Sequence, residues 1–492
     1  MRSELPNIVF IMADDMGYGD VGCYNPESKI PTPNMDRLAA EGVRFTDAHS
    51  PSAVCTPTRY GVLTGRYCWR SKLKNNVLYN YEHPLIDAER TTVASMLKNA
   101  GYATACVSKW HLGLGWQTKP GTSVDFEAPL PWPSVSPDTV IEDSIDFTQA
   151  VTGGPNELGF DYAFYTSGCS TAQPPYCFLE NDRTVGIPSV REKTEAGRIG
   201  LMTPGWKHRD ADPTFARKAV EAIEGHASAH PEKPLFLYFT PSAPHEPAVD
   251  SVVPDFMLNK SQAGSRGDLV ALFDWMVGEV LDTLDRCGMA DNTLVIVTSD
   301  NGALAGDRGR SGGGPVQTYD HKSCGDLRGY KAHIWEGGHR EPFLARWPGK
   351  VPAGTVSGEL LCLTDFLATC AAIVDQELPS GAGEDSYDML PALLRRDEAG
   401  DADTIRPDII HHSCFGAFSI RRGDYKLILD TKGSGGWPPP RDENPVPGSP
   451  GQLYNIKDDP YEERDLWEER PAIVAELTDL LETYRQNGRS AG

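Results

Sequence analysis

The sequence predicts an α/β protein with a large, mostly parallel mixed sheet sandwiched by helices, followed by a smaller C-terminal α+β domain carrying an antiparallel sheet. Over residues 1–375, short apolar runs alternate with segments of helical periodicity, which is typical of a parallel sheet covered by helices on both faces. Over residues 376–492 the pattern changes to a hairpin and a closing helix. The chain has 492 residues, 39% of them hydrophobic, enough for one large and one smaller core.

Five short, mainly apolar runs are expected to form strands of the large sheet. They lie at residues 8–12, 102–107, 235–239, 293–298 and 343–347. Runs of this length that end in polar or turn residues are typical of strands buried on both faces. They define the predicted sheet of the first domain, which we place at residues 1–375.

Four helices are expected between these strands. They are predicted at residues 34–41, 92–100, 215–226 and 268–287. Glycine follows the first two, as Gly42 and Gly101, and glycine tolerates the left-handed turn that commonly ends a helix. In the last segment, apolar residues recur with the helical period and mark one buried face.

The second domain, residues 376–492, is expected to contain a hairpin and a terminal helix. Strands are predicted at residues 418–420 and 425–429, around the turn Arg422-Gly-Asp424, and a helix at residues 471–484. A glycine- and proline-rich loop at residues 433–451 precedes that helix. Its sequence fits a surface excursion, a lid or a subunit contact, and a homo-oligomer stays possible.

The charge balance and the apolar pattern argue against several partners. With 46 basic and 69 acidic residues, the formal charge is −23, which disfavours nucleic acid or an anionic membrane as the main partner. No window approaches the ~18 consecutive apolar residues of a membrane span. The 11 cysteines are odd in number and form no C-x-x-C pair, so mostly reduced thiols are expected. Together with the lack of an evident signal peptide, this predicts a cytoplasmic location, and a removed leader stays possible.

Polar side chains follow four of the predicted strands. In chain order they are Asp14 and Asp15, then Lys109 and His111, then His245, then Asp300 and Asn301. The carboxyl ends of parallel strands share one edge of an open sheet, and ligands bind there. These residues are therefore predicted to meet in one crevice.

The oxygen-bearing residues of this set suit a hard divalent cation. Asp14, Asp15, Asp300 and Asn301 offer only carboxylate and amide oxygens. Such ligands favour Ca²⁺ or Mg²⁺ over zinc. Either acidic pair alone fits a solvated turn or a helix cap, but two pairs that follow strands of one sheet favour a metal site.

A longer motif identifies the family that this chain resembles. Cys55-Thr-Pro-Thr-Arg59, which continues to Leu63-Thr-Gly-Arg66, resembles the signature of the type I sulfatases of the alkaline phosphatase superfamily. Further similar segments are Asn7-Ile-Val-Phe-Ile-Met-Ala-Asp14-Asp15, Ser108-Lys109-Trp110-His111-Leu112-Gly113, Pro241-Ser-Ala-Pro-His245, Thr298-Ser-Asp300-Asn301-Gly302 and Leu327-Arg-Gly-Tyr-Lys331. Ser108 stands where the family usually has glycine. The resemblance covers essentially the whole chain and implies an alkaline-phosphatase-like fold.

The resemblance implies a sulfuric ester hydrolase, arylsulfatase-like, in which Cys55 is oxidised to formylglycine. Its hydrated gem-diol would attack sulfur, held by a divalent metal, most simply Ca²⁺, with Mg²⁺ or Mn²⁺ as alternatives. The implied metal ligands are Asp14, Asp15, Cys55, Asp300 and Asn301. The implied catalytic residues are Cys55, Arg59, Lys109, His111, His245, Asp300 and Lys331, of which Lys109, His245 and Lys331 also bind substrate.

Within that scheme, His245 protonates the departing alcohol with help from Lys331, and His111 acts as the later general base. Arg59, Lys109 and Lys331 clamp the sulfate oxygens. Thr166 and Ser167 are both candidates for a further sulfate contact. Irregular segments at residues 306–320, His321 and the pair His411-His412 are candidates for substrate selectivity, and loop or hairpin surface is an equally good interpretation of them.

The substrate is expected to be a small-molecule or carbohydrate sulfate ester, and a formylglycine-generating enzyme is the expected maturation partner. An alternative is a phosphonate or phosphate ester hydrolase with the same modified cysteine. Asn301 favours the sulfatase, because the phosphonate-ester relatives typically have histidine there. A third interpretation, a binder of sulfated glycans with an unmodified Cys55, fits poorly with so complete a set of polar residues.

Overall fold

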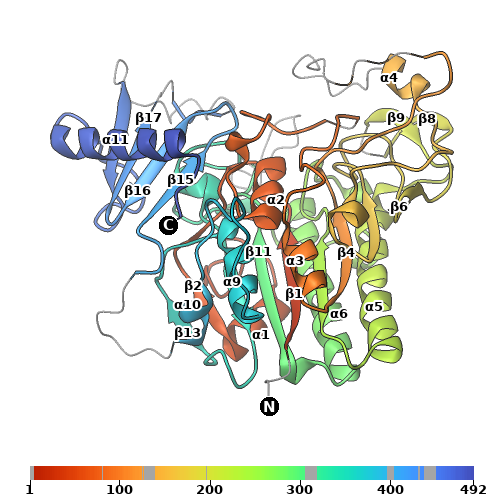
Figure 1. Cartoon of the computed structure of the whole chain (residues 1–492), viewed down its shortest axis with the longest axis horizontal. Coiled ribbons are helices and arrows are strands. Elements are labelled where there is room, and N and C mark those ends of the chain that lie inside the picture. Colours follow the sequence, from red (N-terminus) through yellow and green to blue (C-terminus); the bar gives the residue numbers. More distant parts are fainter. Residues whose placement is uncertain are drawn as a thin grey trace.

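A ten-stranded mixed sheet forms the centre of the molecule in a computed structural model of the chain (Figure 1). The structure describes residues 5–79, 81–122, 124, 126, 139–195, 197–304, 319–395, 404–429, 433–436 and 450–491. The strands, in sheet order, are β13 (Thr355–Ser357), β2 (Val43–Phe45), β12 (Phe343–Arg346), β11 (Thr293–Ser299), β1 (Asn7–Ala13), β10 (Leu235–Thr240), β4 (Ala103–Lys109), β5 (Tyr162–Thr166), β6 (Leu179–Glu180) and β7 (Arg183–Thr184).

The middle of the sheet is parallel and its margins are mixed. β11, β1, β10, β4 and β5 run in one direction, whereas β12 is antiparallel to β11, and β6 is antiparallel to β5. The fold class predicted from the sequence is confirmed. Because β1 lies between β10 and β11, the order of the strands reverses there, and in such sheets the ligand crevice lies at this reversal.

Alternate residues of β1 face two different hydrophobic cores. Ile8, Phe10 and Met12 pack in one cluster, and Val9 and Ile11 pack in the other. This alternation is the two-residue period of a strand buried on both faces. The first core includes residues of α2 (Cys55–Thr64), α3 (Val93–Asn99), α9 (Phe366–Ile373) and α10 (Leu390–Leu394). The second includes residues of α1 (Pro33–Glu41), α5 (Ala211–Ala229) and α6 (Gly264–Arg286).

The helices extend or refine the predicted ones. α5 and α6 each begin four residues before the predicted start, at Ala211 and Gly264. α3 begins after Thr92, whose hydroxyl accepts a hydrogen bond from Ser95 N. Gly101 has φ +99°, so the left-handed turn predicted after α3 is present.

Gly42 ends α1 for a different reason from the predicted one. Its φ is −144°, which is outside the left-handed region. A Cβ at this position would instead lie 2.0 Å from the carbonyl oxygen of Ala345 in β12. The close approach of two backbones, and not the turn, therefore requires glycine here.

The C-terminal part forms a separate four-stranded antiparallel sheet. Its order is β15 (Asp408–His412), β16 (Phe418–Arg422), β17 (Tyr425–Leu429) and β18 (Gly451–Asn455). The apolar side of α11 (Pro471–Asn487) packs on it through residues such as Leu477 and Leu481. The predicted hairpin and closing helix are confirmed, while residues 437–449 of the predicted loop lie outside the described part. Figure 1 shows this sheet and α11 at the upper left, beside the large sheet.

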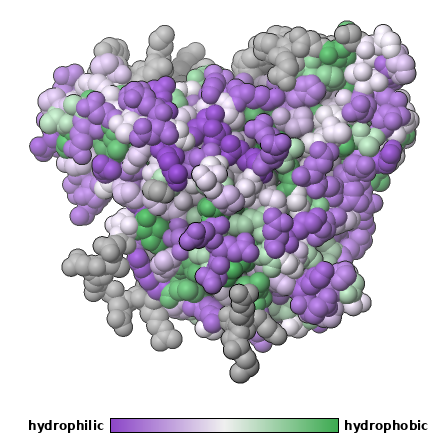
Figure 2. Space-filling view, in the orientation of Figure 1, coloured by the Kyte–Doolittle hydropathy of each residue, from purple (hydrophilic) through white to green (hydrophobic). Residues whose placement is uncertain are grey.

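The remaining elements are short. They are β3 (Ala48–His49) paired with β14 (Leu361–Cys362), the hairpin of β8 (Val190–Lys193) and β9 (Ile199–Met202), α4 (Thr139–Ser144) and α8 (Glu336–His339). Among the described residues, no helix combines the length and apolar character needed to cross a membrane. Figure 2 shows a mainly hydrophilic face with small, scattered apolar groups.

Candidate active site

The helix α2 presents Cys55 and Arg59 on one face. Cys55 is the first residue of α2, and Arg59 follows one turn later, at the i+4 spacing that brings side chains together on a helix. Cys55 Sγ lies 3.4 Å from Asp14 Oδ1, and Arg59 Nη2 donates a 2.9 Å hydrogen bond to Asp300 Oδ2. All ten residues of α2 are buried, so the helix holds both groups in fixed positions.

Three carboxylates and one amide gather at the ends of β1 and β11. Asp14 and Asp15 come directly after β1, and Asp300 and Asn301 directly after β11. Asp15 N donates to Asp300 Oδ1 at 3.2 Å, and Asn301 Nδ2 donates to Asp15 Oδ1 at 2.8 Å. All four residues are buried. The predicted convergence at one sheet edge is therefore present in the structure.

Buried cations neutralise these carboxylates. Lys109 Nζ contacts Asp14 Oδ2, and Arg59 Nη2 lies 3.6 Å from the same oxygen. Lys331 Nζ lies 2.6 Å from Asp15 Oδ1 and 2.7 Å from Oδ2. Without these partners, three buried carboxylates would repel each other strongly.

Burial and the neighbouring charges shift the pKa values of Asp14 and Asp300 in opposite directions. Burial alone would raise the pKa of Asp14, but Lys109 and His245 together hold this pKa well below its ordinary value. Burial and the negative charge of Asp14 raise the pKa of Asp300 to about 7. The two neighbouring carboxylates thus differ in proton affinity because four cationic groups lower the pKa of Asp14, whereas the charges of Asp14 and Asp15 raise that of Asp300.

His245 belongs to the same cluster and has a thiol beside it. Its Nε2 is 3.9 Å from Asp15 Oδ2 and 3.4 Å from Cys169 Sγ, and its Nδ1 donates to the Glu246 carbonyl oxygen at 2.7 Å. Burial opposes protonation, but Cys169 raises the pKa of His245 well above its ordinary value. The sequence-based list missed Cys169, whose only signal is its position three residues after β5.

His111 adjoins Cys55 through the backbone. Thr56, the neighbour of Cys55, donates to the His111 carbonyl oxygen at 2.9 Å. The ring Nε2 donates to the Leu78 carbonyl oxygen at 2.8 Å, which leaves Nδ1 buried and without a hydrogen-bond partner among the described residues. Burial, Lys109 and Arg59 lower the pKa of His111 well below its ordinary value, so the ring is neutral and its free nitrogen is a proton acceptor.

The two candidate sulfate contacts differ in their surroundings. Thr166 Oγ1 donates to the Gly168 carbonyl oxygen at 2.9 Å, so its hydroxyl is engaged. Ser167 Oγ is buried and has no hydrogen-bond partner within the described ranges. The backbone carbonyl of Ser167 accepts from His111 N, which places this segment beside the site.

The described donor set fits a hard divalent cation. Ligand atoms of Asp14, Asp15, Cys55 and His245 lie within 4.8 Å of one another. Asn301 Oδ1 is buried and lacks a hydrogen-bond partner in the described part of the chain, so an acceptor is left over for a cation. The carboxylate and amide oxygens can therefore hold a metal ion at this point.

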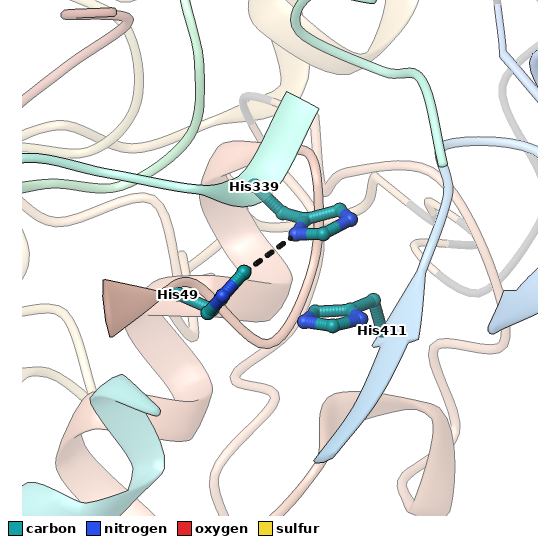
Figure 3. Close-up of side chains that lie close together, drawn as sticks. All are labelled: His49, His339 and His411. Atoms are coloured by element: carbon teal, nitrogen blue, oxygen red, sulfur yellow. Dashed lines mark hydrogen bonds between the residues drawn. The ribbon is translucent and has the colours of Figure 1, made fainter. Parts of the chain in front are cut away.

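A separate cluster of histidines joins the large domain to the C-terminal sheet. His49, His339 and His411 lie close together, and His49 Nδ1 is 3.0 Å from His339 Nδ1 (Figure 3). The rings of His339 and His411 stack at 3.7 Å with an angle of 14°, so their in-plane lone pairs run parallel and do not converge on one ion. Burial lowers the pKa of each ring. The cluster is thus a neutral structural contact.

The positions considered for selectivity are mostly buried. His411 belongs to that cluster, and His321 Nε2 lies 2.8 Å from Asp20 Oδ1 inside the protein. Neither ring reaches solvent. Residues 305–318, which make up most of the predicted segment 306–320, lie outside the described residues.

Comparison with known proteins agrees with the geometry. A family model described as Sulfatase matches residues 6–375. The chain is 34% identical to an N-acetylgalactosamine-6-O-sulfatase of Bacteroides thetaiotaomicron, over 98% of this chain and 94% of the relative. It is 31% identical to arylsulfatase A of Homo sapiens, over 98% of this chain and 86% of the relative. A solved structure described under metabolism of multiple glycosaminoglycans by Bacteroides thetaiotaomicron superposes with a TM-score of 0.82 at 32% identity, covering 98% of this chain and all of the other.

Proposed function

The chain belongs to the sulfatase family and hydrolyses sulfate esters, and from this premise we propose its nucleophile, its metal and its substrate class. One observation carries the proposal: Cys55 Sγ lies beside Asp14, in a buried set of three carboxylates and three cations at the end of the central strands. A sulfate monoester is a compact anion, so its hydrolysis needs fixed positive charge and an oxygen nucleophile in one place.

The unmodified thiol of Cys55 is poorly suited to that role. Burial and the charge of Asp14 raise the pKa of Cys55 to about 11, so the thiol keeps its proton near neutral pH. Formylglycine at this position supplies an aldehyde hydrate, whose hydroxyl is the nucleophile. We expect a formylglycine-generating enzyme as the partner in maturation.

The surrounding side chains hold the sulfate group and the charge that develops on it. Arg59, Lys109 and Lys331 face the carboxylates now and are within reach of anionic oxygens in the same space. Asp14, Asp15, Asp300, Asn301 and residue 55 would hold a divalent ion, most simply Ca²⁺, with Mg²⁺ or Mn²⁺ as alternatives, which supplies additional positive charge.

Two histidines divide the proton transfers. His245 carries a proton because its pKa is raised, so it can donate from Nε2 to the departing alcohol oxygen, with Lys331 nearby. His111 is neutral and has a buried, unpartnered Nδ1, so it can accept a proton from residue 55 afterwards. Opposite shifts in pKa assign these two rings to opposite roles.

For the substrate we propose a carbohydrate sulfate ester, with a 6-O-sulfate on an N-acetylgalactosamine unit as the first to test. The support is the similarity over 98% of the chain to a relative with that activity in its name. The phosphonate or phosphate ester alternative gains no support, because the matched relatives are sulfatases. The cytoplasmic location stays a prediction, and all 11 cysteines are free thiols, which a reducing compartment would preserve.

The decisive experiment combines mass spectrometry with turnover. The peptide that contains residue 55 should have the mass of the aldehyde, and the protein should hydrolyse 4-nitrophenyl sulfate and N-acetylgalactosamine 6-sulfate. Cys55→Ala and Asp300→Ala should each lower kcat by on the order of 10³-fold or more without loss of the folded circular-dichroism spectrum. A chelator should lower activity, and Ca²⁺ should restore it.

Cys287→Ala is the matched control, because Cys287 is a partly exposed thiol at the end of α6. It should retain full activity. Full activity in Cys55→Ala, or an unmodified cysteine in an active enzyme, would overturn the proposed nucleophile. A strong preference for phenyl phosphonate esters over sulfates would overturn the proposed reaction.

A further inference from the structure

A hollow of about 710 Å³ lies between α11, the segment that follows α2 and the connection from β15 to β16. Trp69, Lys74, His412, Phe415, Phe418 and Arg485 are among its lining residues. Its volume falls within the ~300–1,000 Å³ typical of ligand pockets. None of these residues belongs to the catalytic set described above.

The hollow is basic in an acidic protein. The chain carries a formal charge of −23, yet four basic side chains line this hollow against one acidic one, Glu482. Arg66 and Arg70 are held by Glu384 and Asp385, and Arg485 pairs with Glu482 at 2.5 Å, so these three arginines already have acidic partners. Lys74 is exposed, donates to the Trp69 carbonyl oxygen at 3.0 Å and has no acidic partner among the described residues. Its positive charge is therefore available to an anionic ligand.

Aromatic rings line the same hollow. Phe415 is 48% exposed, and the Trp69 and Phe418 rings meet edge to face at 5.2 Å. The Arg485 guanidinium lies 4.8 Å from the centre of the Phe418 ring. Aromatic faces next to cationic groups combine an apolar surface with polar anchors, the lining that fits a sugar ring bearing a charged substituent.

The wall of the hollow adjoins the catalytic segments. The His412 carbonyl oxygen accepts hydrogen bonds from Ser52 Oγ at 2.9 Å and Ala53 N at 3.1 Å, two and three residues before Cys55. Cys414 N donates to the carbonyl oxygen of Ala332, the neighbour of Lys331, at 3.1 Å. The backbone of the hollow wall is thus hydrogen-bonded to segments that carry Cys55 and Lys331.

We propose that this hollow binds the further sugar units of an anionic carbohydrate chain whose sulfated unit lies at residue 55. The proposal rests on the proposed function and extends it: the enzyme acts on oligosaccharides in preference to single sugars. Lys74 contacts an acidic group of a neighbouring unit, and Phe415 packs against the apolar face of a ring.

The test compares substrates of increasing length. The probes are 4-nitrophenyl sulfate, N-acetylgalactosamine 6-sulfate, and a tetrasaccharide and hexasaccharide that end in N-acetylgalactosamine 6-sulfate. In the unmodified protein, kcat/KM should be at least about 10-fold higher for the hexasaccharide than for the monosaccharide. Lys74→Ala and Phe415→Ala should each lower kcat/KM for the hexasaccharide about 5- to 10-fold, mainly through KM, and leave 4-nitrophenyl sulfate unchanged. Salt should reduce the effect of Lys74→Ala more than that of Phe415→Ala.

Two exposed residues outside the hollow provide matched controls. Lys350→Ala removes another exposed lysine, and Phe256→Ala removes a phenylalanine that is also 48% exposed. Neither should alter the preference for length. Equal kcat/KM for all lengths, or the same loss with all probes in Lys74→Ala and Phe415→Ala, would overturn the proposal while leaving sulfatase activity intact.

Absence of turnover with every probe would instead count against the proposed function. In that case, calorimetric binding of the hexasaccharide still decides the role of the hollow. Weaker binding in Lys74→Ala and Phe415→Ala than in the two controls supports it, and equal binding in all four variants rejects it. Formation of a dimer that the Phe415→Ala change abolishes would assign the hollow to a second copy of the chain and would also reject it.

Discussion

Asp20 supports the loop that carries Asp14 and Asp15. It accepts hydrogen bonds from Arg266 Nη1 at 2.8 Å, Arg266 Nη2 at 2.6 Å and Gly17 N at 2.8 Å, and Arg266 Nη2 also donates to the Asp15 carbonyl oxygen at 2.9 Å. Burial would raise the pKa of Asp20, but the charge and hydrogen bonds of Arg266 lower it to about 2. The carboxylate is therefore stabilised in its charged form by the fold.

This shift predicts a pH-dependent loss of stability in Asp20→Asn. The folded protein binds the proton more weakly than the unfolded chain, so the stabilisation is complete above about pH 4 and is lost as the pH falls toward 2. A shift from 3.8 to about 2 corresponds to about 2 kcal/mol. At pH 7, Asp20→Asn should lower the free energy of unfolding by at least that amount in urea, and the gap should narrow at pH 3. The exposed change Asp458→Asn should have no such effect, and a gap independent of pH would refute the assignment.

At the level of single residues, the sequence predicts the site wherever a side chain follows a recognisable strand or motif. Asp14 and Asp300 each follow an apolar run, so their meeting could be expected from the shared sheet edge. Cys169 could not, because its contact with His245 depends on the path of a loop after β5 that has no periodic signal. His411, considered for selectivity or as hairpin surface, lies buried and stacks on His339, a contact that the sequence gives no means of predicting.

Replacing glycine by alanine is expected to change the stability of the protein in opposite directions at Gly42 and Gly225. Gly42→Ala would place a Cβ 2.0 Å from the Ala345 carbonyl oxygen and force β12 away from the end of α1. We expect a loss of about 1–3 kcal/mol. Gly225 lies within α5, and a Cβ there meets no atom within 4 Å, so Gly225→Ala should stabilise the protein by up to about 1 kcal/mol. Denaturant midpoints of both variants test this, and a neutral Gly42→Ala would show that the backbones can separate freely.

Helices and strands with a clear apolar pattern could be predicted from the sequence. Those that are stabilised mainly by contacts with other parts of the chain could not. β1, β10 and β11 each have an uninterrupted apolar centre of four or more residues, so burial on both faces is visible in the sequence. α2 contains proline, glycine and three threonines and has little intrinsic helix propensity. Its surroundings bury all ten residues, which stabilises the helix by packing. β15 has only two apolar residues, Ile409 and Ile410, and is fixed in the sheet by its antiparallel pairing with β16.

At the scale of the whole molecule, one lysine links the C-terminal sheet to the large domain. Lys426 Nζ, on β17, lies 2.9 Å from Glu336 Oε1 and 2.9 Å from Glu462 Oε1, and all three side chains are fully buried. Burial would raise the pKa of Glu336, but the charge of Lys426 holds this pKa well below its ordinary value. Removal of the cation would leave two carboxylates facing each other in the interior.

Lys426→Met should therefore destabilise the protein by about 3–5 kcal/mol, the usual cost of breaking a buried ion pair. Adding Glu336→Gln and Glu462→Gln should recover part of this loss, because the remaining groups are then neutral. Lys457→Met breaks an exposed pair with Asp424 and should change the unfolding midpoint little. If the triple variant were no more stable than Lys426→Met, repulsion between the carboxylates would not explain the loss.

The overall division into a mixed sheet with helices and a terminal antiparallel sheet could be predicted from the order of apolar runs. The contact between the two parts could not, because it depends on pairs such as Lys426 with Glu336, which are 90 residues apart. Burial of charged residues has no local pattern in the sequence, since it is stabilised only by the partner across the interface.

The hydrogen bond between Ser52 and the His412 carbonyl oxygen joins residues 360 positions apart, so it can form only late in protein synthesis. At ~5–20 residues per second, the ribosome takes roughly 20–70 s to pass from one partner to the other. Until His412 is synthesised, Ser52 and the segment before Cys55 lack this partner. In the complete fold the Cys55 side chain is only 2% exposed. Any enzyme that oxidises it has that interval in which to reach the nascent chain, and slower elongation between the two positions should raise the modified fraction.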